Sequence, residues 1–314
     1  MMRLALCPQP FARAGLDAAL DAAQELGVAG IELVVGLVDV DLLLEKGTDS
    51  LARALERRKL AISAVSVHQE GQLLLGPHHA DSDAIHQGTP AEKIAFASER
   101  IRKAVDLAAR LGVPHVVGFV GCEDQTRLFP WPDPQGWEKM LPAFRERMLP
   151  LLDHCARRKV RFGQEPHPKQ IVYNTETALE SVALLDGHPA WGFNLDPANL
   201  LLAGVDPVDF AQALEGRVLH VHAKDGELPP HNRRSGLLAH GAWDRKDRGF
   251  RFRVPGWGDV PWKRLITELV LTKFDGFLAI ENEDPVFEPM DGFRKAIATL
   301  APLLPQGERR ERWW

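Results

Sequence analysis

Four acidic or histidine side chains stand at the ends of four separate short apolar runs. FGQEPHP carries Glu165, NLDPANL carries Asp196, HVHAKD carries His222 and AIENED carries Glu281. Three carboxylates and one imidazole suit Mn²⁺, Mg²⁺, Co²⁺ or Zn²⁺ better than a thiolate-seeking metal. A buried carboxylate is unfavourable unless it is paired or metal-bound, and one shared cation would offset that cost for all three. We therefore predict that the four residues converge on one divalent ion, with Mn²⁺ as the first choice.

Such an ion would have positions open for two adjacent oxygens of a hydroxy-carbonyl compound. There it would polarise the carbonyl and lower the pKa of the neighbouring C–H. Glu165 and Glu281 could each use a free carboxylate oxygen as acid or base, on opposite faces of the substrate. The predicted chemistry is therefore proton transfer next to a carbonyl.

Three more polar residues follow or lie within apolar runs. We predict that His68 contacts the substrate, although a histidine that fills the barrel would show the same pattern. His220 lies two residues before His222, on the same side of a strand, and is interpreted as a packing or ligand-supporting residue. Glu32 either belongs to the site or pairs with an Arg or Lys near the first helices.

These residues need a scaffold that gathers many strand ends. Short apolar runs alternate with segments of helical periodicity along the chain, which predicts eight β/α units. The predicted strands are 4–7, 30–35, 61–67, 115–120, 161–165, 191–196, 218–224 and 276–281. Near-continuous apolar strands are typical of parallel sheets, so the prediction is one α/β domain over residues 1–314, a (β/α)8 TIM barrel with its active site at the carboxyl ends of the strands. A doubly wound sheet is the alternative, but the Gly-rich first turn common in that fold is absent.

The segments between the strands give clear signals at some points only. Thr89–Glu92 reads as a capping box with proline at the first helical position, and Gly112 is predicted to end that helix. Residues 226–259 are predicted to form a long polar, basic loop. The tail 307–314 (GERRERWW) is expected to act at most as a packing latch.

Composition narrows the class of protein. The chain has 314 residues, is 45% hydrophobic and carries a formal charge of −5, which gives no basic footprint for nucleic acid or an anionic membrane. Cys7, Cys122 and Cys155 are scattered without CxxC spacing, which fits a reducing compartment, the cytoplasm. No apolar run reaches the roughly 18 residues that a membrane span needs.

With these motifs in place, the sequence resembles the xylose isomerase-like TIM-barrel superfamily, in its sugar phosphate isomerase/epimerase group. The resemblance covers nearly the whole chain. Its specific parts are SVHQEG, VVGFVGC, FGQEPHP with VYNTET, FNLDPANL, LHVHAKD, VPGWGDVPW and AIENEDP. It implies Glu165, Asp196, His222 and Glu281 as metal ligands.

The resemblance also implies residues near the substrate. They are His68, His167 and Lys224, with Asp225 holding Lys224 or a substrate hydroxyl. One position departs from the usual pattern, because the group commonly has a histidine where this chain has Asn199. An amide cannot act as a readily protonated acid, but it could donate a hydrogen bond to a substrate oxygen.

The function implied is a cytoplasmic, divalent-metal-dependent isomerase or epimerase. It would act on a keto-sugar or related hydroxy-ketone by carboxylate proton transfer through an enediolate. Members of a similar subgroup act on 3-keto sugars, including lyases that split C-glycosides, some with a small partner subunit. A lyase or dehydratase on 3-keto-glycosides is therefore one alternative, and a non-catalytic sugar-binding barrel is another.

The sequence argues against a nuclease. The superfamily contains AP endonucleases with three zinc ions, which need extra histidines after strand four and in the strand-seven loop. Here strand four ends in Gly118-Phe119-Val120, and Asp247-Arg248-Gly249 stands where an Asp-x-His pair is expected. We expect a carbohydrate substrate, no nucleic-acid or membrane partner, and either a homo-oligomer or a small partner subunit.

Overall fold

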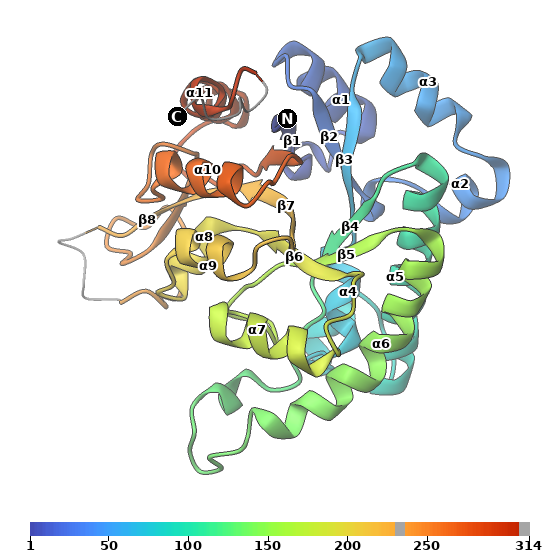
Figure 1. The fold of residues 1–314 in the computed structure, drawn as a ribbon, viewed down its shortest axis with the longest axis vertical. Helices are drawn as coiled ribbons and strands as arrows, with labels where there is room; N and C mark the ends of the chain where they lie inside the picture. Colours follow the sequence, from blue (N-terminus) through green and yellow to red (C-terminus); the bar gives the residue numbers. More distant parts are fainter. Residues whose placement is uncertain (230–235, 308–314) are drawn as a thin grey trace, which may run out of the picture.

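The computed structural model describes residues 1–229 and 236–307, and in these ranges eight parallel strands close into a barrel (Figure 1). The strands are β1 (Arg3–Leu6), β2 (Gly30–Val34), β3 (Ala61–Ser66), β4 (His115–Gly118), β5 (Arg161–Gln164), β6 (Trp191–Leu195), β7 (Val218–Ala223) and β10 (Phe277–Ile280). Each pairs with the next in chain order, and β1 closes the ring against β10. The predicted (β/α)8 TIM barrel is confirmed.

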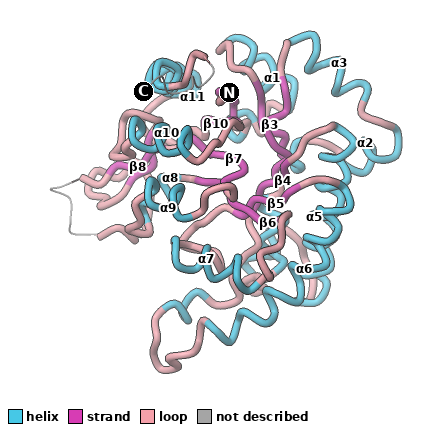
Figure 2. Tube along the Cα trace, viewed as in Figure 1, coloured by secondary structure: helices cyan, strands magenta, loops and turns pink. Residues whose placement is uncertain are grey.

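Helices surround the strands, as Figure 2 shows. Their bounds are α1 (Leu16–Glu25), α2 (Val40–Lys46), α3 (Asp49–Arg58), α4 (His68–Gly71), α5 (Pro90–Leu111), α6 (Leu141–Arg158), α7 (Thr175–Leu184), α8 (Pro197–Leu202), α9 (Pro207–Ala213), α10 (Trp262–Leu271) and α11 (Pro289–Leu300). Helix α5 begins as predicted, because the Thr89 hydroxyl accepts from the Glu92 amide and the Glu92 carboxylate accepts from the Thr89 amide. It ends at Gly112, whose φ of 69° is left-handed.

The apolar core lies between the barrel and these helices. All residues of β6 and β10 are buried. The ring of Trp191 packs against Phe144 of α6 and Phe162 of β5, with centroids 5.7 and 6.1 Å away. Complete burial of one large apolar side chain stabilises a fold by roughly 1.5–3 kcal/mol. The strands therefore read as continuous apolar runs because both of their faces are covered.

Polar side chains occur inside the barrel, where they are hydrogen-bonded. His220 is fully buried, with Nδ1 3.1 Å from Oδ1 of Asn194 and Nε2 3.3 Å from Oγ of Ser63. These contacts agree with the interpretation of His220 as a packing residue. They also connect β7 to β6 and β3 across the interior.

The segment after β7 differs from the prediction of a long polar, basic loop over residues 226–259. It contains a two-stranded antiparallel sheet, β8 (Asp225–Glu227) with β9 (Arg251–Arg253). These two strands are rich in charged residues and so lack an apolar strand pattern in the sequence. In the structure the Glu227 carboxylate accepts hydrogen bonds from both Arg251 and Arg253. The stretch between β2 and β3 forms two helices, α2 and α3, which are separated at Gly47, whose φ is 97°.

Two other sequence predictions concern the C-terminal tail and membrane spans. Residues 308–314 of the tail lie outside the described ranges, and so does its predicted packing role. Within the described part of the chain, no helix combines the length and hydropathy that a membrane span requires.

Candidate metal centre

Glu165, Asp196, His222 and Glu281 meet at the carboxyl end of the barrel. One possible ligand atom from each lies within 4.8 Å of those of the other three. Glu165, Asp196 and Glu281 each follow the last residue of a strand, whereas His222 lies within β7. All four are buried, and Glu281 is the most exposed at 7%. The structure therefore brings together the whole set that the sequence singled out.

The imidazole of His222 lies between carboxylates on both sides. Its Nδ1 is 2.8 Å from Oε2 of Glu165 and 3.3 Å from Oε2 of Glu281, and its Nε2 is 2.7 Å from Oε2 of Glu32. Metal-bound histidines commonly donate their second N–H to a carboxylate in this way. Glu32 pairs with His222, so the alternative that it pairs with an Arg or Lys is wrong. Burial acts to raise the pKa of Glu32, but His222 and the nearby His220 lower it to about 2.

The Glu165 carboxylate is surrounded by further hydrogen-bond partners. Oε2 lies 3.0 Å from Nε2 of His68 and accepts from Nδ2 of Asn194 at 2.7 Å. Oε1 accepts from Nδ2 of Asn199 at 2.8 Å. His68 is oriented in turn by Ser66, whose Oγ is 2.7 Å from Nδ1. Although burial raises the pKa of Glu165, the facing histidines hold it well below its usual range.

Asp196 is both a candidate ligand and a helix cap. Its Oδ1 accepts from the backbone amides of Ala198 and Asn199, which starts the short helix α8 that the sequence analysis missed. Its Oδ2 accepts from Nδ2 of Asn199 at 2.9 Å and lies 2.8 Å from Nζ of Lys224. Burial raises the pKa of Asp196 to about 7, with Lys224 acting in the opposite direction.

The structure places Asn199 against two of the candidate ligands. Its amide nitrogen donates to both Glu165 and Asp196, so its N–H groups are engaged by two carboxylates of the cluster. The two carboxylate acceptors also fix which end of the amide faces them. Asn199 therefore positions the ligands.

Lys224 contributes a buried ammonium to the same cluster. Its Nζ is 2.8 Å from Oδ2 of Asp196, 2.8 Å from Oε2 of Glu281 and 3.1 Å from Oε2 of Glu283. Burial acts to lower the pKa of Lys224, but the carboxylates around it raise it well above its ordinary value. Its contact with the acidic residues was not expected.

The donor set fits a divalent ion. His222 Nδ1 and Glu281 Oε2 are buried, lie among charged neighbours, and make no hydrogen bond of acceptable geometry with the described residues. Such atoms gain a partner if they coordinate a metal. Three carboxylates and one imidazole nitrogen form an oxygen-rich set typical of Mn²⁺, Mg²⁺, Co²⁺ or Zn²⁺ sites.

A cavity of about 490 Å³ opens over this cluster. The residues predicted to contact substrate that line it are His68, His167, Asn199 and Lys224. The other lining residues are Gln9, Gln69, Phe119, Glu165, Trp243, Phe252, Glu281, Glu283 and Pro285. Gln9 is one of several lining residues that the sequence analysis missed, and its Nε2 donates to Oε1 of Glu281 at 3.3 Å. Gln9 follows the first apolar run, and residues just after a barrel strand lie at the active-site end, so its position was the available signal.

His167 presents a defined face to the cavity. Its Nδ1 accepts from the backbone amide of Lys169 at 3.0 Å, which assigns the proton of the neutral ring to Nε2. Burial lowers the pKa of His167 to about 4, so the ring is neutral near pH 7. It can therefore donate one hydrogen bond to a ligand oxygen.

Asp225 does not take the position that the resemblance implies. Its Oδ1 accepts from the amides of Gly226 and Val260, and its Oδ2 accepts from the amide of Gly256 and from Nε1 of Trp262. All these partners belong to the segment from β8 to α10. Asp225 is fully buried and fixes that segment, so the prediction that it holds Lys224 or a substrate hydroxyl is wrong.

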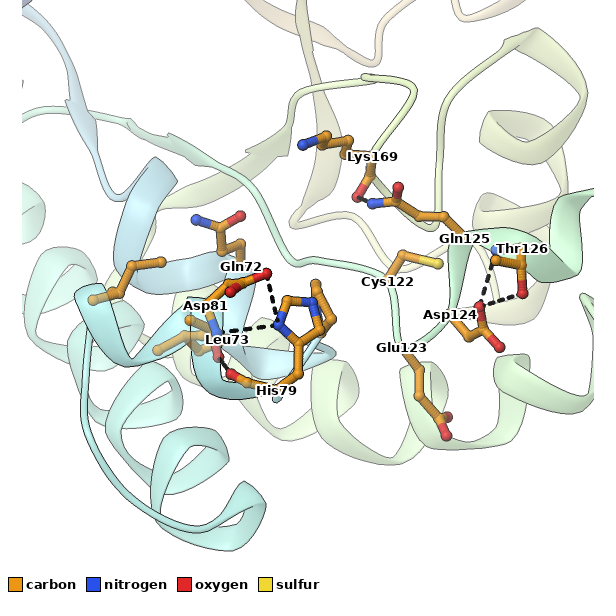
Figure 3. A pocket seen from close by; sticks show the side chains of 13 residues that line it. Gln72, Leu73, His79, Asp81, Cys122, Glu123, Asp124, Gln125, Thr126 and Lys169 are labelled. Atoms are coloured by element: carbon orange, nitrogen blue, oxygen red, sulfur yellow. Dashed lines mark hydrogen bonds and ion pairs between the residues drawn. The ribbon is translucent and has the colours of Figure 1, made fainter. Parts of the chain in front are cut away.

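A second cavity, of about 520 Å³, lies between the segments on either side of β4 (Figure 3). On one side Nδ1 of His79 lies 3.5 Å from Oδ2 of Asp81, and on the other Gln125 donates to the carbonyl of Lys169. Within the described ranges, none of the groups able to hold a metal lies there. Its larger volume does not make it the chemical centre.

Comparison with known proteins supports this description. Residues 20–303 match the family model described as xylose isomerase-like TIM barrel. The uncharacterized protein YfiH of Bacillus subtilis is 24% identical over 337 aligned residues, which cover 97% of this chain and 100% of that protein.

Solved structures share the fold at low sequence identity. The 3-keto-D-glucoside 4-epimerase YcjR of E. coli has a TM-score of 0.69 and 15% identity, covering 96% of this chain and 100% of that one. The probable 3-DHS dehydratase AsbF of Bacillus anthracis has a TM-score of 0.68 and 20% identity, covering 96% and 99%. The IOLI protein, solved with a zinc atom, has a TM-score of 0.67 and 16% identity, covering 96% and 98%.

Proposed function

The chain belongs to the xylose isomerase-like TIM-barrel family, and on that basis we propose that it is a divalent-metal-dependent sugar isomerase or epimerase. The substrate class is a keto-sugar or related hydroxy-ketone. The reaction is proton transfer at a carbon next to a carbonyl, through an enediolate. The structural neighbours that are named as sugar epimerases support this class.

One observation carries the proposal. Possible ligand atoms of Glu165, Asp196, His222 and Glu281 come from the carboxyl-end regions of four separate strands and lie within 4.8 Å of one another. We propose that these residues hold one ion, Mn²⁺ first, with Mg²⁺, Co²⁺ or Zn²⁺ as alternatives; the zinc atom of the IOLI protein is consistent with such a centre. When bound, the ion would polarise the substrate carbonyl and acidify the adjacent C–H.

The protein groups have separate roles in this scheme. Glu165 and Glu281 both line the cavity and act as the base and acid that remove and return the proton. Among the described residues, Gln9 is the only hydrogen-bond partner of Oε1 of Glu281, which leaves this oxygen better placed than the crowded Glu165 carboxylate to take the proton first. His167 donates a hydrogen bond to a substrate oxygen through Nε2–H.

A second candidate function uses the same first step. The similarity to AsbF, named a probable dehydratase, and to an epimerase of 3-keto-glucosides favours a lyase or dehydratase on a 3-keto-glycoside. After the C–H proton moves to a carboxylate, the electron pair expels a group from the next carbon. A protonated side chain supplies the proton that the leaving group needs.

Solvent-deuterium exchange separates the candidates. The metal-loaded protein is incubated in D₂O with a panel of ketoses and 3-keto-glycosides, and the substrates are followed by NMR. Glu281→Gln and Glu165→Gln serve as the inactive controls. Exchange with a retained carbon skeleton supports the isomerase, and release of water or an aglycone supports the lyase. Binding without any exchange would leave a non-catalytic sugar-binding barrel and would refute both enzymes.

We also propose a cytoplasmic location, because all three cysteines are free and buried. Association as a homo-oligomer or with a small partner subunit remains a prediction. Size-exclusion chromatography with light scattering on the purified protein tests for a homo-oligomer. The same measurement on protein isolated from its native host tests for a partner subunit.

A further inference from the structure

We propose that Lys224 is a built-in competitor of the divalent ion: its ammonium shares two of the four metal ligands, and ion binding moves it toward Glu283. The inference rests on the proposed metal-dependent function. It adds that the affinity of the centre for metal is set by a lysine that is not a ligand. It also adds that metal loading and the position of this ammonium in the cavity are coupled.

The shared atoms are the basis of the competition. Nζ of Lys224 is 2.8 Å from Oδ2 of Asp196 and 2.8 Å from Oε2 of Glu281. Lys224 follows the end of β7, and its Nζ and Nδ1 of His222 both approach Oε2 of Glu281, at 2.8 and 3.3 Å. An ion held by these carboxylates would lie close to the ammonium, and two cations at such a distance repel each other.

The ammonium also stabilises the cluster of acids. Glu165, Asp196 and Glu281 bring three carboxylates together in a buried site, where like charges are costly unless a cation lies among them. Lys224 is only 3% exposed, so little water screens its contacts. The lysine and the ion would therefore both neutralise the same carboxylates, and the presence of one makes binding of the other less favourable.

A second position for the ammonium is already present. Oε2 of Glu283 lies 3.1 Å from Nζ, and this side chain is 45% exposed at the cavity. The ring of Phe252 lies 4.6 Å from Nζ, and Trp243 packs on Phe252 with centroids 4.9 Å apart. An aromatic face and an outer carboxylate can both stabilise a cation. On metal loading, the ammonium would turn toward Glu283 and face the substrate space.

Calorimetric titration of metal-stripped protein with MnCl₂, and separately with ZnCl₂, tests this inference without a substrate. We expect Lys224→Met to bind at least tenfold more tightly than the native protein, and Lys224→Gln to behave in the same way. Lys103→Met is the matched control, because Lys103 also pairs with two carboxylates but on the outer surface of α5. Its affinity should equal that of the native protein.

A double-mutant cycle isolates the role of Glu283. Glu283→Gln should weaken metal binding several-fold in the native background and have little effect in the Lys224→Met background, since it acts through the lysine. Circular dichroism and thermal unfolding confirm that each variant is folded. If Lys224→Met and Lys224→Gln bind metal as weakly as the native protein, or more weakly, the inference is wrong while the metal centre stands. If no variant binds either metal, the proposed function fails with it.

Discussion

Oε2 of Glu32 lies 2.7 Å from Nε2 of His222, and both side chains are almost completely buried. This contact joins β2 to β7 across the inside of the barrel. It orients the ring so that Nδ1 faces Glu165 and Glu281. The position of the candidate metal ligand therefore depends on a residue 190 positions earlier in the chain.

Replacing Glu32 by glutamine tests that dependence. The neutral amide should hold the ring less firmly and weaken binding of Mn²⁺ or Zn²⁺ about 10–100-fold, as expected for a partner of a metal-bound histidine. Titration calorimetry measures the change, with the exposed Glu215→Gln as the control. Unchanged affinity in Glu32→Gln would show that the pair has no influence on the centre.

Asn199→Ala should separate the two carboxylates that the amide joins. Removing buried hydrogen bonds to charged groups costs about 1.5–3 kcal/mol each, so the free energy of unfolding should fall by roughly 2–4 kcal/mol after relaxation of the carboxylates. Urea unfolding of the metal-stripped protein measures this loss. Asn199→Asp adds a further negative charge and should be less stable still; an Asp variant as stable as the native protein would contradict the assignment.

Asp225→Ala should reduce stability because it removes the anchor of the segment between β8 and α10. Four donors would lose their buried acceptor, and the expected loss in the free energy of unfolding is about 3 kcal/mol or more. Limited proteolysis should then cut between residues 236 and 250 faster than in the native protein. If the variant had normal stability but reduced sugar binding, Asp225 would instead be a substrate-contacting residue.

A pH effect is expected at the opposite end of the barrel. Burial, followed by the charge of Arg161, lowers the pKa of His115 from 6.5 to about 4. Between these values the unfolded chain binds a proton that the native state does not, so stability falls as the pH decreases from 6.5 to 4. The contribution is at most about 3 kcal/mol.

His115→Gln removes this titration. Urea unfolding at pH 7 and pH 4.5 should show a smaller acid-induced loss for the variant than for the native protein. The exposed His79→Gln serves as the comparison. An equal loss in His115→Gln and the native protein would show that His115 does not carry the effect.

The barrel could be predicted from sequence because its strands are buried on both faces. Runs such as Trp191–Leu195 are therefore apolar throughout, and parallel strands place their carboxyl ends on one side. That rule was sufficient to bring Glu165 and Asp196 together. It needs only the order of elements, which the alternation of strand and helix patterns supplies.

The contacts that complete the site could not be predicted in this way. The pairing of Glu32 with His222 depends on which side chains meet across the barrel interior, which strand order alone does not fix. The resemblance implied that Asp225 holds Lys224 or a substrate hydroxyl, yet its side chain points to the backbone of a later loop. Gly258 in the VPGWGDVPW motif shows the same constraint, because a Cβ there would collide with Asp225.

The central claim is that Glu165, Asp196, His222 and Glu281 bind one ion. The direct test is a crystal structure of the protein grown with Zn²⁺ or Mn²⁺, with anomalous data collected at the absorption edge of the metal. We predict one peak bonded to Nδ1 of His222 and to an oxygen of each carboxylate, at about 2.0–2.2 Å for zinc. No peak at the barrel mouth, or a peak that lacks Glu165 and Glu281 as ligands, would contradict the account.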